Sequence, residues 1–251
     1  MILKTENITK FYEKQCVIEN INVELEKGEM VCVLGHSGVG KTTLFNVLAG
    51  LLEPDSGRVL LNGEDITGNP GNISYMLQKD LLLPYKTVLN NVILPFIIRK
   101  KDKKQAVERA MELMPMFGLE GYENKYPSQL SGGMKQRAAF LRTYLTGIAR
   151  DEAEGVLLLD EPFSALDNMT KYSIHQWYLD IAEKMNFSTL FITHDIDEAV
   201  LLSDRIYIIQ GIPGVVAHEL RIENKPKDRE HLKDYMLSEE FLEYKRLIHS
   251  F

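Results

Sequence analysis

Cysteine, long apolar runs and net positive charge are all scarce in this chain, and each scarcity excludes a class of protein. The two cysteines, Cys16 and Cys32, lie in apolar, strand-like surroundings. We therefore expect two small buried side chains in a reducing cytosol rather than a disulfide or a metal pair. The apolar stretch at 92–98 contains Pro95 and is far shorter than the ~20 residues that a membrane span needs. With 29 basic against 36 acidic residues, a nucleic-acid partner is not expected.

The rest of the composition is that of a globular protein. Apolar residues make up 45% and charged residues 26% of the 251 residues, close to the average for soluble domains. The 17 glycines and 9 prolines are too few for a collagen-like or low-complexity chain. The N-terminus lacks the basic start and long apolar run of a signal peptide. We expect a cytosolic protein of one large or two smaller domains, with no membrane segment of its own.

Buried strands and helices alternate along the sequence. Continuous apolar runs at 30–34, 156–159, 189–193 and 205–209 predict strands that are covered on both faces of a mostly parallel sheet. Helical spacing follows at 42–48, at 87–119 and at 132–148, and short strands with turns are predicted at 2–23 and 56–65. The charged run 99–104 reads as a solvated helix boundary, and the residues after Arg221 as one or two helices. The alternation indicates an α/β domain with a helical insertion.

The strongest motif lies between the strand at 30–34 and the helix at 42–48. Residues 35–42 read GHSGVGKT and fit the pattern G-x-x-x-x-G-K-[ST]. Successive backbone N–H groups of such a loop point into one concavity, and the positive end of the following helix adds its field, so phosphate oxygens bind there. Lys41 would reach the β- and γ-phosphates as a point charge. Thr42 would offer its hydroxyl to a magnesium ion.

Two other interpretations of this loop fail on single residues. A dinucleotide-binding fingerprint needs a third glycine where Thr43 stands. A hydrolase nucleophile around Ser37 needs a glycine where Val39 stands. We therefore expect a phosphate-binding loop.

Two weaker motifs follow along the chain. The strand at 156–159 ends in Asp160 and Glu161, a carboxylate pair that could hold magnesium through water and polarise an attacking water. Alone, the pair is equally consistent with a strand end and a helix cap. Ser131 is a plausible N-cap before Gly132 and Gly133, where a backbone can approach an anion closely. Alone, that pattern favours an exposed, capped helix.

Together these motifs resemble the ATP-binding cassette (ABC) ATPases. The segment 130–133, LSGG, resembles the signature motif of that family, and the other motifs occur in the family's order over roughly residues 1–215. Residues 35–42 match the Walker A loop, and 156–160 match Walker B. Residues 164–167, SALD, resemble the D-loop, and His194 matches the switch histidine.

The resemblance implies a P-loop NTPase fold of the α/β class, with a RecA-like core sheet, an antiparallel β subdomain and a helical signature subdomain. It places the ATPase domain at 1–220, with the helical subdomain at about 86–150, and a helical extension at 221–251.

The resemblance also implies a role for each matched residue, with ATP and Mg²⁺ as the bound species. Catalysis is assigned to Glu161, His194, Gln78 and Lys41, and the metal ligands are Thr42, Gln78 and Asp160. Tyr12 would stack on adenine, the alternative being a strand aromatic in the core. The remaining nucleotide contacts fall on Gly35, His36, Ser37, Gly38, Val39, Gly40, Thr43, Ser131, Gly132, Gly133 and Asp167.

In the family, two cassettes pair head to tail, so ATP on Lys41 of one copy is covered by Ser131 and Gly133 of the other. The chain has one set of motifs and therefore needs a second copy or a related cassette. The segments 77–85, LQKDLLLPY, and 161–167, EPFSALD, resemble those of ATPases of nitrate, sulfonate and taurine importers. Importers of thiamine-precursor pyrimidines have similar cassettes. The resemblance implies membrane permease subunits as partners, a solute-binding protein indirectly, and a place on the inner face of the membrane.

Two questions stay open at the level of sequence. Leu82, Pro84 and Tyr85 belong to an apolar stretch after Gln78, which could line a groove for a permease helix or could seed the core of the helical subdomain. The alternative function is a soluble, non-transport ABC ATPase of the cofactor-assembly type. The acidic residues 151, 152 and 154 predict a longer exposed loop between 147 and 155.

Overall fold

The computed structural model describes residues 1–150, 155–164, 168–223, 225 and 232–251. The chain divides into two compact units. The first comprises Met1–Ile73 and Phe187–Phe251, and the second comprises Ser74–Asn186.

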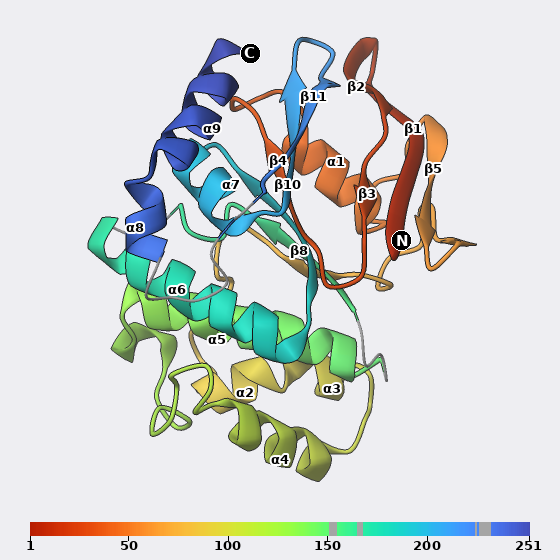
Figure 1. The fold of residues 1–251 in the computed structure, drawn as a ribbon. Helices are drawn as coiled ribbons and strands as arrows, with labels where there is room; N and C mark the ends of the chain where they lie inside the picture. The colour runs from red at the N-terminus through yellow and green to blue at the C-terminus, as the bar shows by residue number, and fades with distance from the viewer. Residues whose placement is uncertain (151–154, 165–167, 224, 226–231) are drawn as a thin grey trace. The chain divides into compact units, whose positions relative to one another are not determined.

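An antiparallel sheet forms the N-terminal part of the first unit (Figure 1). Its strands are β1 (Leu3–Tyr12), β2 (Gln15–Ile21), β5 (Ser56–Leu61) and β6 (Glu64–Asp65), in the order β2-β1-β5-β6, and β3 (Glu24–Leu25) also pairs with β1. At the start of β1, buried Leu3 and Thr5 alternate with half-buried Lys4 and Glu6, which is the period-two pattern of a sheet covered on one face. The strands predicted at 2–23 and 56–65 are thus confirmed.

Parallel strands form the core of the first unit. β10 (Arg205–Gln210), β4 (Met30–Leu34) and β9 (Ser188–Thr193) lie side by side in parallel, and β11 (Val215–Arg221) adds an antiparallel edge to β10. All five residues of β4 and all six of β9 are buried, as the continuous apolar runs predicted. Helix α1 (Lys41–Leu48) follows β4. The chain ends in two helices, α8 (Leu232–Met236) and α9 (Glu239–Ser250). Helix α7 (Ile196–Leu202) packs on β4 and on α9.

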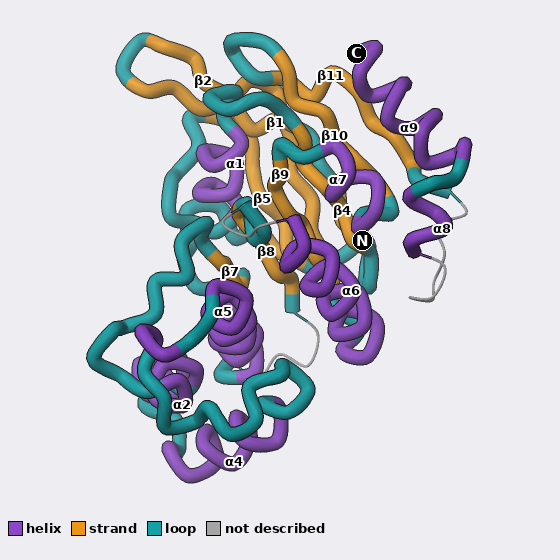
Figure 2. The backbone as a smooth tube through the Cα atoms, turned by 90° about the vertical axis from the view of Figure 1, so that its left-hand side faces the viewer, coloured by secondary structure: helices purple, strands orange, loops and turns teal. Residues whose placement is uncertain are grey.

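The second unit is built around a long helix and a pair of parallel strands. Helix α5 (Gly132–Ile148) runs beside β7 (Ser74–Met76), which pairs in parallel with β8 (Val156–Asp160), and α2 (Val88–Val92) and α3 (Leu94–Ile98) pack on α5 (Figure 2). Helix α4 (Lys103–Leu113), the short 3₁₀ turn Pro127–Gln129 and α6 (Asn168–Met185) complete the unit. Phe140 of α5 meets Trp177 and Tyr178 of α6 edge to face, with ring centroids 5.7 and 5.3 Å apart.

The helical spacing predicted over 87–119 resolves into three helices. Pro95 sits at the start of α3, where it needs no N–H partner, and Lys100 has a positive φ of 55°, so the chain turns before α4 begins. The basic run around it is exposed, as expected of a helix boundary. Cys32 is buried and Cys16 half-buried, and both are free thiols. No helix in the described ranges is long and apolar enough to cross a membrane. The domain limits at 86–150 and 220 stay predictions.

Arg205 ties three segments of the first unit together, which generates a stability prediction. Its side chain is 4% exposed and donates to Glu29 Oε2 at 2.8 Å, to the Glu24 carbonyl at 3.0 Å and to Glu219 Oε1 at 3.3 Å. Arg205→Ala removes the partner of a carboxylate that is itself largely buried, so we expect a loss of about 3–5 kcal/mol in the free energy of unfolding. Urea denaturation followed by circular dichroism measures it.

Arg246→Ala is the matched control for Arg205→Ala. Arg246 pairs with Glu239 at 2.8 Å, but both side chains are mostly exposed, so the loss should stay below about 1 kcal/mol. Equal losses in the two variants would contradict the structural role of Arg205.

Candidate functional site

The phosphate loop lies where β4 ends and α1 begins. Gly40 is the N-cap of α1, with φ 96°, in the left-handed region that glycine tolerates. A Cβ at this position would overlap the Ile18 side chain of β2. Glycine cannot cap the helix with a side chain, and α1 has no side-chain cap hydrogen bond, as is typical of helix starts that bind anions. The local backbone geometry therefore fits the phosphate-binding loop that the motif predicts.

The Lys41 ammonium is folded back onto this loop. Its Nζ donates to the carbonyl oxygens of Gly35 at 2.6 Å and His36 at 2.9 Å, and the residue is only 6% exposed. A buried charge needs such partners, and here they hold the two ends of the loop together. Thr42 and Ser37 are exposed beside it, and Thr43 is half-buried. Burial raises the pKa of the Cys32 thiol on β4, so Cys32 stays protonated and acts as a packing residue.

His194 lies at the end of the strand next to the phosphate loop. Leu34 of β4 pairs in parallel with Thr193 of β9, so residues 35 and 194 leave the same edge of the sheet. The turn is fixed by hydrogen bonds: the buried Thr193 hydroxyl donates to Glu198 Oε2 at 2.6 Å and accepts from the Asp195 amide at 3.0 Å. Asp195 in turn caps α7. His194 itself is exposed.

Tyr12 ends β1 and is 49% exposed, at the hairpin where it pairs with Gln15. This exposure rules out the alternative that Tyr12 is an aromatic of the core. The ring is accessible to a flat ligand such as a purine.

In the second unit, the two predicted carboxylates leave the end of β8, and β7 supplies a partner to each. Asp160 is 5% exposed, and the Tyr75 hydroxyl donates to its Oδ2 at 3.3 Å. Gln78, just past β7, donates from Nε2 to Glu161 Oε2 at 3.1 Å. The sequence placed Gln78, Asp160 and Glu161 in one site, and the structure brings these three together. Burial and then the charge of Asp160 raise the pKa of Tyr75.

Glu161 has a strained backbone. Its φ is 45°, which is uncommon for a residue with a Cβ and costs about 1–3 kcal/mol unless the surroundings enforce it. Two hydrogen bonds from Ser164 help to hold this backbone conformation. Its amide and its hydroxyl both donate to the Glu161 carbonyl, at 3.2 and 3.0 Å. Strain of this kind concentrates at functional sites.

The signature segment begins helix α5. The Ser131 side chain accepts from the Met134 amide at 3.3 Å, which confirms the predicted N-cap, and Gly132 and Gly133 form the first turn. One turn later, Gln136 Nε2 donates to the carbonyl of Pro162, directly after Glu161. A hydrogen bond therefore links helix α5 to the segment that carries the Glu161 carboxylate.

Arg142 of α5 holds the loop that follows Gln78. It donates from Nη2 to the Asp80 carbonyl at 2.6 Å and from Nη1 to the Leu81 carbonyl at 2.8 Å. Leu81 has φ 46°, and this turn leaves its side chain exposed while that of Leu82 is 7% exposed. Burial lowers the pKa of Arg142, and the charge of Asp80 opposes that shift.

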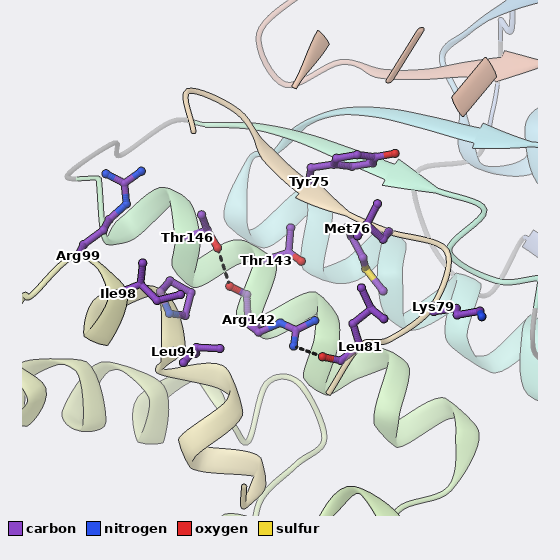
Figure 3. Close-up of a pocket in the computed structure, with 12 residues that line it drawn as sticks. Tyr75, Met76, Lys79, Leu81, Leu94, Ile98, Arg99, Arg142, Thr143 and Thr146 are labelled. Atoms are coloured by element: carbon purple, nitrogen blue, oxygen red, sulfur yellow. Dashed lines mark hydrogen bonds between the residues drawn. The ribbon is translucent and has the colours of Figure 1, made fainter. Parts of the chain in front are cut away.

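An open pocket of about 410 Å³ lies between this loop, α3 and α5 (Figure 3). Its lining is formed by Tyr75, Met76, Leu77, Lys79, Leu81, Leu94, Pro95, Ile98, Arg99, Arg142, Thr143 and Thr146.

Of the three residues expected to line a groove, Leu82 needs correction. Leu82 is buried in the second unit and packs as a core residue, while Pro84 and Tyr85 are exposed but do not line the pocket. The turn at Leu81 explains the change, because it directs Leu81 rather than Leu82 outward. Asp167, of the predicted D-loop, and the acidic residues 151, 152 and 154 lie outside the described residues.

The donor set fits a magnesium ion. In the second unit, the Asp160 carboxylate and the Gln78 amide are hard oxygen donors, and magnesium at a nucleotide needs only one or two protein ligands besides phosphate oxygens and water. In the described ranges, no three His, Cys, Asp or Glu side chains gather into a protein-only metal cage.

Tyr75, Gln136 and Arg142 are site residues that the sequence reasoning missed. Each acts through a neighbour, and no spacing rule marks such contacts. The signals present in the sequence were modest: Tyr75 precedes Gln78 by three positions, and Gln136 and Arg142 lie one and three turns into the helix that Ser131 caps.

Glycine at position 40 gives a test of the loop geometry. Gly40→Ala should abolish nucleotide binding, because a Cβ there is strained and overlaps Ile18. Gly38→Ala shares the strain, with φ 88°, but its Cβ would meet no atom within 4 Å, so it should retain measurable binding. Calorimetric titration with ATP checks both variants. Equal affinities would contradict this account of the loop.

Comparison with known proteins places the chain in a family. The family model described as ABC transporter matches residues 18–164. The formylaminopyrimidine import ATP-binding protein of Halalkalibacterium halodurans is 45% identical over 84% of this chain and 81% of its own length. The aliphatic sulfonates import ATP-binding protein of Bacillus cereus is 40% identical over 90% and 87%. The nitrate import ATP-binding protein of Synechocystis is 39% identical over 86% and 79%.

Solved structures agree with the sequence relatives. A dimeric ATP-binding cassette in a post-hydrolysis state, bound to ADP and Pi, matches with a TM-score of 0.73 and 29% identity, over 89% of this chain and 100% of that one. The fold is the ABC cassette variant of the P-loop NTPases, with parallel strands and an antiparallel subdomain. The chain belongs to the ABC transporter family and is one of its ATP-binding, ATP-hydrolysing subunits.

Proposed function

We propose that this chain energises an importer of small molecules of the nitrate, sulfonate and taurine type, or of a thiamine-precursor-like molecule. The observation that carries the proposal is its identity of 39–45% to three import ATP-binding proteins over more than four-fifths of its length. The chain would act at the cytoplasmic face of the membrane, attached to permease subunits that carry the transport path. The transported molecule itself would never touch it.

The first unit would hold the nucleotide. Tyr12 would stack on adenine, and the loop at 35–43 would surround the phosphates with backbone N–H groups. Lys41 already lies inside the loop on two carbonyls, from which its ammonium can turn to the γ-phosphate. His194, on the neighbouring strand end, would sense that phosphate.

Gln78, Asp160 and Glu161 would supply the hydrolytic groups. Thr42, Gln78 and Asp160 would hold Mg²⁺, which when bound neutralises charge on the phosphate oxygens. Glu161 would take a proton from the attacking water, and its hydrogen bond to Gln78 fixes where its carboxylate points. Hydrolysis of this kind needs no covalent intermediate on the protein.

Two copies would be needed to complete each site. The chain has one phosphate loop and one signature helix start. In a head-to-tail pair, Ser131, Gly133 and Asp167 of one copy would cover the ATP on Lys41 of the other. A solved relative, a bacterial ABC transporter cassette, is dimeric, and C₂ pairs are the commonest protein assembly. ATP would then close the pair and hydrolysis would reopen it.

The pocket of the second unit would receive a short helix of the permease. Leu81, Ile98 and Leu94 give it apolar walls, and Ile98 is 71% exposed, as the seat of a partner helix requires. Arg142 links the loop of this pocket to the signature helix. A docked helix could thus bias the nucleotide-binding half of the neighbouring copy.

The catalytic assignment predicts the behaviour of Glu161→Gln. The variant keeps the phosphate loop but loses the carboxylate that accepts the proton of the water, so ATP binding should persist while turnover falls about 100-fold or more. An ATP-bound dimer should accumulate, which size-exclusion chromatography with light scattering detects. Glu183→Gln, an exposed acid on α6, is the control and should hydrolyse normally. Turnover by Glu161→Gln at the wild-type rate would remove Glu161 from the mechanism.

The docking assignment predicts a second phenotype. Replacing Leu81 and Ile98 together by Ser should spare ATP hydrolysis by the isolated protein but weaken co-purification with the permease and abolish uptake. Each lost anchor costs about 1–3 kcal/mol at an interface. The control is the pair Ile212→Ser and Leu237→Ser, exposed apolar residues that do not line the pocket. Normal permease binding by the Leu81 and Ile98 variant would refute the assignment.

A further inference from the structure

The register of the two strands in the second unit places Tyr75 and Asp160 on one face. In the parallel pair, Tyr75 lies opposite Leu158 and Met76 opposite Leu159. Side chains alternate along a strand, so Asp160 shares the face of Leu158 and therefore that of Tyr75. The phenol reaches Asp160 diagonally, and its hydroxyl lies 3.3 Å from Oδ2.

The other residues of β7 face the opposite way. The Arg150 guanidinium, just past the end of helix α5, donates a hydrogen bond to the Ser74 hydroxyl. Met76 lies on the same face of β7 as Ser74. In Figure 3, Tyr75 extends to the other side of β7 from Arg142 and Leu94. The phenol is therefore directed at the carboxylate rather than into the body of the pocket.

A hydrogen bond to Oδ2 limits how the carboxylate can rotate. An ionised carboxylate only accepts hydrogen bonds, so the phenol is the donor. The last torsion of an aspartate is broad and roughly two-fold, and a partner on one oxygen selects one orientation. Magnesium demands near-ideal octahedral geometry, which makes the orientation of a ligand matter to its affinity.

We propose that Tyr75 is a positioning residue for the metal: its hydroxyl orients the Asp160 carboxylate so that the carboxylate can hold Mg²⁺ beside the nucleotide. The inference rests on the proposed function, in which Asp160 is a metal ligand. Gln78 likewise donates a hydrogen bond to the Glu161 carboxylate. In this way β7 and the residues directly after it orient both acids at the end of β8. Partners of this outer kind typically contribute 10–100-fold to metal affinity.

Tyr75→Phe tests the proposal, because it removes one oxygen and keeps the ring. The measurement is Mn²⁺ binding to the full-length protein saturated with ADP, followed by electron paramagnetic resonance of the free ion. We expect the dissociation constant for Mn²⁺ to rise about 10-fold or more. ADP affinity in EDTA and the midpoint of thermal unfolding should remain those of the wild type, since a role confined to packing would move these two quantities instead.

Three further variants separate the possible outcomes. Tyr144→Phe removes a hydroxyl from α5 of the same unit, on a ring that stacks on Phe117, and should leave Mn²⁺ affinity unchanged. Asp160→Asn should weaken Mn²⁺ binding more than Tyr75→Phe does. Combining Asp160→Asn with Tyr75→Phe should add no further loss, because the hydroxyl acts only through the carboxylate.

Three results would overturn the inference, and they are distinguishable. Wild-type Mn²⁺ affinity in Tyr75→Phe together with weak binding in Asp160→Asn would remove Tyr75 and leave the proposed function standing. Wild-type affinity in Asp160→Asn would remove the metal ligand itself, and with it the metal assignment of the proposed function. A loss in Tyr75→Phe that equals its loss of ADP affinity in EDTA would show a structural role only.

Discussion

The phosphate loop depends on the buried ammonium of Lys41. Its two hydrogen bonds to loop carbonyls hold residues 35 and 36 against the start of α1, in a place with little access to water. Without that ammonium, the two loop carbonyls would lose their charged hydrogen-bond donor, at a cost of about 1.5–3 kcal/mol each. The same ammonium makes the concavity positive, so the interaction that stabilises the loop also prepares it for phosphate.

The acids of the second unit illustrate a related constraint. A carboxylate that must hold a metal or activate a water has to be buried enough to act strongly, yet must keep its charge and its orientation. Two neutral donors contact these acids: the phenol of Tyr75 bonds Asp160, and the amide of Gln78 bonds Glu161. Neutral donors orient a carboxylate without neutralising it, whereas a lysine or arginine at either place would compete with the metal. The positive φ of Glu161 adds rigidity at the same point.

Much of this could be predicted from the sequence, and the reason is physical. Strands β4, β8, β9 and β10 are buried on both faces, so each appears as an unbroken apolar run. β11 was missed because it is an edge strand with alternating exposure, and β7 because three residues are too few to show a pattern. The phosphate loop could be predicted from the sequence because its backbone geometry requires glycine and its charge requires a lysine at fixed positions. The Tyr75 and Arg142 contacts could not, since they depend on strand register and on the turn at Leu81.

The central claim is that phosphate loop and signature segment complete each other only between two copies of the chain. Mixing two inactive variants tests it most directly: Lys41→Ala, which lacks a working loop, and Ser131→Arg, which lacks a working signature. In an equal mixture about half of the dimers combine the two variants, and each has one intact site, so ATP hydrolysis should return to as much as about a quarter of the wild-type rate. A mixture no more active than either variant alone would contradict the claim.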